Sequence, residues 1–259
     1  MREQLGAEVC SLKDAVDRGP IGIGRKHPGV RRKANAGEAD DEQCRNKALE
    51  QHEFSVLLCS GELTIRSMSD QPTAADVLLF WFGPPENRGK RDKRWFDKDD
   101  AFDRQCKDRF LPLYEKAAAG EQAHWKESSS ECLALILLLD QFPRNMFRGT
   151  PRAFAADALA LDAARHAVGK GFDGTLLPVE RMFVYLPFEH SESLEDQIRA
   201  CELTKPLIAF PETADAYRYA VLHRDIIQRF GRFPHRNALL GRPSTLEEIE
   251  FLKQPGSGF

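Results

Sequence analysis

The sequence lacks the patterns that define several common classes of protein. Its six cysteines are scattered without a Cys-x-x-Cys pair, which is typical of a reducing compartment and argues against a disulfide framework or a zinc site. The longest apolar run, residues 132–139, is far shorter than the roughly 20 residues that a membrane-spanning helix needs. We therefore expect a soluble, cytoplasmic protein without a membrane partner.

A strong excess of charge is also missing. The 259 residues include 37 Lys and Arg against 40 Asp and Glu, so the formal net charge is −3. A protein that attracts nucleic acid through its overall charge carries a basic excess instead. We expect no nucleic-acid partner, and any binding of an anion has to be local.

Signatures of familiar reactions do not occur either. The chain has no Gly-x-Ser-x-Gly elbow, phosphate-binding loop or cysteine nucleophile signature. Gly22 and Gly24 lack the strand, the third glycine and the helix of a dinucleotide-binding loop. The sequence therefore predicts no cofactor, and it leaves open whether the protein is an enzyme.

Residues 1–67 differ in composition from the rest of the chain. Residues 19–42 scatter glycine and charge without a hydrophobic period, and such a stretch cannot bury enough apolar surface to offset the entropy lost on ordering. We predict that residues 1–67 form a disordered or poorly structured extension, in which the basic cluster at 25–33 is a solvated charge run. The segment that begins at Met68 has the pattern expected at the start of a domain. Met68 is therefore a candidate for an alternative or true translation start.

From Thr73 onward the sequence carries repeated signals for helix starts. Thr73, Ser128, Ser193 and Ser244 each precede an acidic residue by three positions, and Thr150 is followed directly by proline. We predict seven or eight helices and no strand, in a single all-α domain over 68–259 whose short loops favour antiparallel helix pairs. The expected spans are 73–82, 98–119 with a bend at Pro112, 130–142, 151–168, 178–186, 194–208, 213–230 and 245–252.

The segment CLALILLLDQF, residues 132–142, is apolar on every face. A helix with that pattern is covered all round by others, so we expect it to be the central one. Asp140 and Gln141 then lie at its end. A carboxylate removed from water needs a partner, and Arg144 or Arg148 is the nearest cation in the sequence.

Two phrases of the chain share a Phe-Pro corner followed directly or after one residue by an Arg-Asn pair: LLDQFPRNMFRG at 138–149 and FGRFPHRNALLGR at 230–242. Arginine presents a planar fork of donors that suits carboxylate or phosphate, and asparagine both donates and accepts hydrogen bonds. The pairs predict either a polar binding pocket or a buried polar network. We expect Arg144 and Arg236 to lie close together, and Arg232 has the structural alternative of capping its helix.

His190 lies between Glu189 and Glu192 in the phrase LPFEHSE at 186–192. A histidine flanked by carboxylates is typical of general acid–base chemistry or of a divalent metal. We expect no metal, because the spacings of helical metal motifs are missing. Helix capping is the alternative for some of the carboxylates. His223, on an apolar helix face, is more typical of a hydrogen-bonded core residue than of a catalyst.

Six phrases in order resemble the bacterial family catalogued as domain of unknown function 924, from about residue 75 to the C-terminus. They are DVLLFWFG, RWFDKDDAFD, LALILLLDQFPRNMFRG, AFAADALAL, FVYLPFEHSE and FGRFPHRNALLGRPSTLEEIEFL. The resemblance implies an all-α fold similar to the tetratricopeptide superfamily and no established activity. The motif residues that it brings over are Asp140, Gln141, Arg144, Asn145, Arg148, Glu189, His190, Glu192, Gln197, His223, Arg232, His235, Arg236 and Asn237.

The leading hypothesis places these residues around one polar cleft that binds a small anionic molecule. Arg144, Arg148 and Arg236 are the expected anion clamps, and His190 with Glu189 or Glu192 supplies the candidates for acid–base chemistry. The other expected ligand-binding residues are Asp140, Gln141, Asn145, His223, Arg232, His235 and Asn237. The alternative hypothesis is a helical-repeat scaffold that holds a protein partner, with the same polar residues as internal locks.

The composition break at Met68 predicts that residues 68–259 fold without the preceding segment. Deleting residues 1–67 should leave the free energy of unfolding nearly unchanged, because the helical pattern begins only after Met68. Thermal unfolding of the shortened chain checks this, and loss of a cooperative transition would show that the extension is part of the core.

Overall fold

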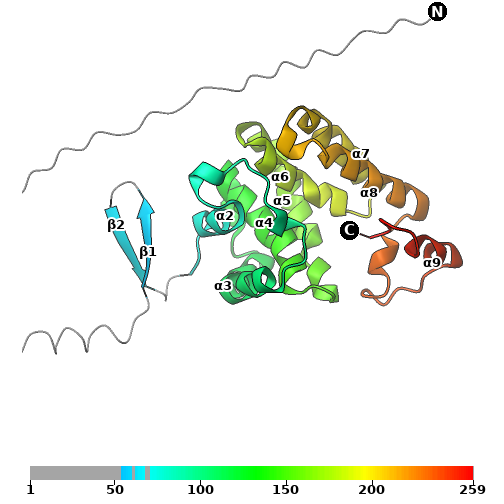
Figure 1. Cartoon of the computed structure of the whole chain (residues 1–259), viewed down its shortest axis with the longest axis horizontal. Coiled ribbons are helices and arrows are strands. Elements are labelled where there is room, and N and C mark those ends of the chain that lie inside the picture. Colours follow the sequence, from blue (N-terminus) through cyan, green and yellow to red (C-terminus); the bar gives the residue numbers. More distant parts are fainter. Residues whose placement is uncertain (1–53, 60–61, 68–70, 259) are drawn as a thin grey trace, which may run out of the picture. The chain divides into compact units, whose positions relative to one another are not determined.

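A computed structural model of the protein describes residues 54–59, 62–67 and 71–258 (Figure 1). Strands β1 (Phe54–Cys59) and β2 (Glu62–Ser67) pair antiparallel, with Phe54 opposite Ser67. This hairpin differs from the expected lack of structure before residue 68; the signal for it is a run rich in β-formers on both sides of a Ser-Gly pair. The basic cluster at 25–33 and Met68 itself lie outside the described residues.

Eight α-helices and several short 3₁₀ turns make up residues 71–258, which confirms the all-α fold expected for this domain. The expected spans each contain the greater part of one helix. The helices are α2 (Ala74–Phe82), α3 (Asp100–Ala118), α4 (Ser129–Met146), α5 (Asp157–Gly169), α6 (Pro178–His190), α7 (Leu194–Thr204), α8 (Ala216–Phe230) and α9 (Leu246–Leu252).

The helix starts follow the capping chemistry in part. Thr73 and Asp76 form a reciprocal capping box at the start of α2, and the Ser128 hydroxyl accepts from the backbone of Glu131 at the start of α4. At α9 the cap is Thr245, one residue later than the expected Ser244. Ser193 does not cap α7 with its side chain. A serine followed three residues later by an acidic residue is therefore not sufficient to identify a cap.

Two helices continue through a proline beyond their expected ends. Pro143 lies within α4 and Pro187 lies within α6. A proline removes one backbone hydrogen bond but does not have to end a helix when packing on both sides holds the backbone. The first Phe-Pro phrase is therefore no corner, a correction that places Arg144 and Glu189 in the last turns of buried helices. Only the second phrase forms a turn, the 3₁₀ segment η8 (Pro234–Arg236).

Helix α4 is the centre of the domain, as its all-round apolar sequence predicted. It packs against α2, α3, α5 and α6, and each helix from α3 to α7 packs against the next helix in the chain, as in tetratricopeptide-like bundles (Figure 1). The indole of Trp81 lies between the rings of Phe142 and Phe183, with ring-centre distances of 5.3 and 5.6 Å. This aromatic packing joins α2, α4 and α6.

None of the helices that the structure describes is both long enough and apolar enough to pass through a lipid bilayer.

The central position of α4 predicts a large cost for shortening its side chains. Replacing the fully buried Leu137 by alanine should lower the free energy of unfolding by about 3 kcal/mol, because the surrounding helices cannot close the cavity. The same change at Leu159, which is 42% exposed, should cost less than about 0.5 kcal/mol. Urea unfolding of both variants measures the difference, and equal costs would contradict the central role of α4.

Candidate functional site

The carboxylate of Asp140 is fully buried at the end of α4. It accepts hydrogen bonds from Nδ1 of His190 at 2.7 Å and from Nε2 of Gln141 at 2.6 Å, and Nη1 of Arg144 lies 3.3 Å away. Burial alone would raise the Asp140 pKa, but the charge of Arg144 and the hydrogen bonds from His190 and Gln141 hold it below its ordinary value. Asp140 is therefore ionised.

The ionised carboxylate determines the tautomer of His190, at the last position of α6. Because the Asp140 oxygen accepts, Nδ1 of His190 donates, and Nε2 keeps its lone pair. Nε2 makes no hydrogen bond within the described residues, and 13% of the side chain stays exposed. Burial, followed by the charge of Arg144, lowers the His190 pKa despite the attraction of Asp140. The result is a neutral imidazole with one accepting nitrogen.

Asp157, in the first turn of α5, joins the two Arg-Asn phrases. Its carboxylate accepts from Nη1 and Nη2 of Arg144 at 3.0 and 3.2 Å and from Nη1 of Arg236 at 3.3 Å. The expected proximity of Arg144 and Arg236 is thus confirmed, with Asp140 among the partners of Arg144. Asp157 is not among the residues predicted from the sequence, where its only signal is an acidic residue at the start of a helix in AFAADALAL.

The remaining arginines of the motifs belong to separate networks. Arg148 places its fork on Asp103 of α3, where Asn145 also donates at 2.7 Å. Arg232 does the same on Glu248 of α9 instead of capping its own helix. The structure therefore does not bring all the expected residues into one cleft, because carboxylates of the chain itself occupy these forks.

Glu192 fastens the C-terminal segment to the loop after α6. Its carboxylate accepts from Nη1 and Nη2 of Arg242 at 2.7 and 3.0 Å and from the backbone N–H of Phe233 at 2.8 Å. Burial opposes ionisation, but these hydrogen bonds lower the Glu192 pKa. Asn237 completes the network by accepting from Nε of Arg242, and the ring of His235 packs at 5.5 Å from that of Phe233. Through these contacts the Glu192 carboxylate holds the C-terminal segment in place.

Glu189 and His223 form an uncharged pair beside Asp140. Glu189 is 1% exposed and its Oε2 lies 3.5 Å from Nδ1 of His223, which donates to the Tyr219 carbonyl at 2.9 Å. Burial and the charge of Asp140 raise the Glu189 pKa well above its ordinary value. Burial lowers the His223 pKa to about 3. His223 is a hydrogen-bonded core residue, as its helix face indicated.

Gln197 holds the backbone at the end of α6 in place. Its Nε2 donates to the carbonyls of Phe188, Glu189 and Ser191 at 3.3, 2.7 and 2.7 Å. These contacts satisfy carbonyls that the end of a helix leaves without partners. Gln197 thereby positions the backbone that carries His190.

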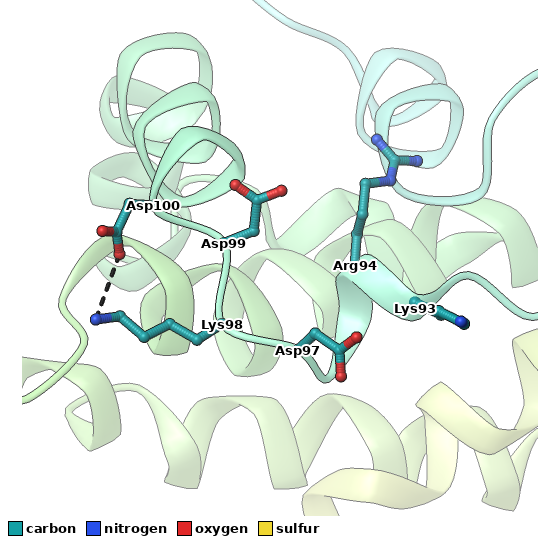
Figure 2. A pocket seen from close by; sticks show the side chains of 6 residues that line it. All are labelled: Lys93, Arg94, Asp97, Lys98, Asp99 and Asp100. Carbon is teal, nitrogen blue, oxygen red and sulfur yellow. Dashed lines mark ion pairs between the residues drawn. The ribbon is translucent and has the colours of Figure 1, made fainter.

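Two surface pockets are lined by residues other than these. One, of about 490 Å³, lies before α3 and is lined by charges of both signs (Figure 2). The other, of about 550 Å³, is lined by residues of α5, α6 and α7. None of the expected site residues lines either one, and no group of metal-ligating side chains occurs in the described part of the chain. The candidate site is the polar cluster, defined as Asp140, Arg144, Asp157, Glu189, His190, His223 and Arg236.

Fold and cluster together define an all-helical, tetratricopeptide-like domain with a charged network at the ends of α4 and α6. The chain belongs to the family described as bacterial protein of unknown function (DUF924), whose model matches residues 77–256. It is similar to the solved structure of a protein of unknown function, ATU0120, from Agrobacterium tumefaciens, with 44% sequence identity and a TM-score of 0.63 over 70% of this chain and 97% of that one. No curated protein matches the chain.

The raised pKa of Glu189 predicts an effect of pH on stability. A carboxyl whose folded pKa is raised contributes fully below its unfolded pKa, near 4.5, and loses this contribution as pH rises toward the folded pKa. The variant Glu189→Gln keeps the shape and has no proton to lose. Its free energy of unfolding relative to the native protein should therefore increase with pH, by up to about 1.4 kcal/mol per pH unit.

Denaturant unfolding at about pH 5 to about pH 8 measures this difference. The exposed Glu195→Gln variant is the matched control and should show no such slope. A difference between Glu189→Gln and the native protein that stays constant over this range would contradict a protonated Glu189.

Proposed function

We propose that the domain binds a small anionic metabolite at the polar cluster and that His190 acts there as a general base and acid. The observation that carries this proposal is the pair formed by Asp140 and His190. A buried, ionised carboxylate fixes Nδ1 as the donor, and Nε2 is left as an acceptor on a partly exposed ring. This is the arrangement by which a histidine accepts a proton from a bound molecule and returns it.

The environment of His190 suits this role better than a purely structural one. A structural histidine has both ring nitrogens occupied, as is usual for buried polar atoms. His190 engages only Nδ1, and its carbonyl accepts from Arg236 at 3.1 Å, which holds the backbone in place. A lowered pKa keeps the imidazole neutral at neutral pH, so Nε2 presents its lone pair to a bound molecule. Protonated Glu189 is the candidate for a second proton donor.

The filled arginine forks reduce the number of residues available to hold an anion. Arg148, Arg232 and Arg242 are each paired with a carboxylate of the chain. Arg144 is paired with Asp140 and Asp157. In the proposed function these four arginines position the cluster, and Arg236 remains to contact the anionic group of the ligand.

The same filled forks favour the alternative function, a scaffold for a protein partner whose polar residues serve as locks. Arg148 joins the segment after α4 to α3, Arg232 joins the segment after α8 to α9, and Arg242 holds the loop after α6. In that case His190 contributes to stability alone. The two functions therefore predict different results for removal of the imidazole: loss of ligand affinity in the first, and loss of stability in the second.

The variant His190→Gln distinguishes them, because glutamine can still donate to Asp140 but does not titrate. A thermal-shift screen of the native protein against anionic metabolites first identifies a molecule that raises the melting temperature. For His190→Gln we expect a nearly unchanged melting temperature without ligand. We also expect that molecule to bind with at least about tenfold lower affinity, since a loss of about 1.4 kcal/mol of binding free energy corresponds to tenfold.

The exposed His124→Gln variant serves as the control and should behave like the native protein in both measurements. A large fall in the melting temperature of His190→Gln with unchanged ligand binding would reject the proposed function in favour of the lock. Failure of any anionic metabolite to stabilise the native protein would also count against it.

A further inference from the structure

We infer that the edge of the Arg236 guanidinium formed by Nε and Nη2 binds one oxyanion group, and that its binding is coupled to proton uptake by His190. The inference rests on the proposed function, because it names the chemical group and the residue that would anchor the ligand. A carboxylate or a phosphate oxyanion has this chemistry, since each offers two oxygens to one planar fork.

Among the motif arginines of the described residues, Arg236 alone has no carboxylate bound by two of its nitrogens, and Arg144 places Nη1 and Nη2 on Asp157. Arg148 and Arg232 use Nε and Nη2 together on one carboxylate, and Nε, Nη1 and Nη2 of Arg242 each have an acceptor. Arg236 makes both of its hydrogen bonds through Nη1, to Asp157 and to the His190 carbonyl. Its Nε is buried without a hydrogen-bond partner in the described residues.

The surroundings of Arg236 make this open edge unusual. The residue is only 7% exposed, and its guanidinium lies over the rings of Phe154 and Phe233 at 4.8 and 4.4 Å from their centres. Burial, followed by repulsion from Arg144, lowers its pKa to about 10. A buried cation with unused donors is incompletely compensated, so an anion at this edge would supply both charge and acceptors.

The charges around His190 explain the coupling to a proton. Asp140 and Asp157 balance Arg144 and Arg236, so the cluster is neutral when the imidazole is neutral. An added anion makes it negative and favours the protonated imidazole. The titratable and charged groups around the ring are Asp140 and Arg144 from α4, Asp157 from α5, Glu189 from α6, His223 from α8, and His235 and Arg236 from the C-terminal segment.

The direction of the pH effect follows from this balance. In the free protein the His190 pKa is lowered, and the anion raises it, so binding takes up a proton. Affinity must then fall as pH rises through the range in which the complex loses that proton. A single coupled proton gives at most about a tenfold change in affinity per pH unit.

The test is an NMR titration of the full chain, labelled with ¹⁵N, using sodium acetate and, separately, inorganic phosphate. The Nε–Hε signal of Arg236 is assigned by its loss in Arg236→Lys, which keeps the charge but not the fork. We expect a saturable shift of this signal, with much smaller shifts at Arg148 and Arg232. Saturation by acetate assigns a carboxylate and saturation by phosphate assigns a phosphate. The absence of a saturable shift with both, or equal shifts at all arginines, would overturn the anchor.

The variant His190→Gln tests the coupling between anion binding and proton uptake separately. In the native protein the acetate affinity should be higher at about pH 6 than at about pH 7, by at most about tenfold, whereas His190→Gln should bind acetate with an affinity independent of pH. Persistent pH dependence in His190→Gln would overturn the coupling. The exposed Arg218→Lys variant controls for general charge. These outcomes are separable from the proposed function, since acetate binding at Arg236 requires no chemistry at His190.

Discussion

The burial of the Asp140 carboxylate is the constraint on which the other features of the domain depend. This group lies at the end of the most buried helix and has no exposed surface, so its charge is tolerated only with partners. Arg144 and His190 provide them, and Asp157 in turn neutralises Arg144 and Arg236. The ends of α4 and α6, the start of α5 and the C-terminal segment must therefore meet at one place. Removing the charge of Asp140 or of Arg144 would leave the other charge buried with less compensation.

Locking and binding are compatible roles for such a network. The arginines with filled forks hold α3, α4 and α9 and the loop after α6 in register, which gives the polar cluster a rigid frame. Within that frame His190 keeps an accepting nitrogen and Arg236 keeps an unfilled edge. Opposing pKa shifts also bound the stability: the lowered His223 pKa costs stability in acid, and the raised Glu189 pKa costs stability toward alkaline pH.

The helices and their order could be predicted from the sequence because their causes are local. Apolar periodicity, caps such as Thr73 and the all-round apolar segment 132–142 act within a few residues of the chain. The errors arose where packing overrode local rules. Pro143 and Pro187 read as breaks, but buried surroundings keep both inside helices. The pairing of β1 with β2 depends on contacts between two strands, which the average composition of residues 1–67 does not show.

For the candidate site, the sequence by itself determined which polar residues stand out and that Arg144 and Arg236 belong together. Only the tertiary structure decided their partners. Asp157 and Asp103 come from other helices and were not singled out, and they separate Arg148 from the polar cluster. The sequence could not show which carboxylate each arginine binds, because a guanidinium can pair with any carboxylate that the fold brings within reach. The tautomer of His190 likewise depends on Asp140, which is distant in the chain and reaches it only through the packing of α4 against α6.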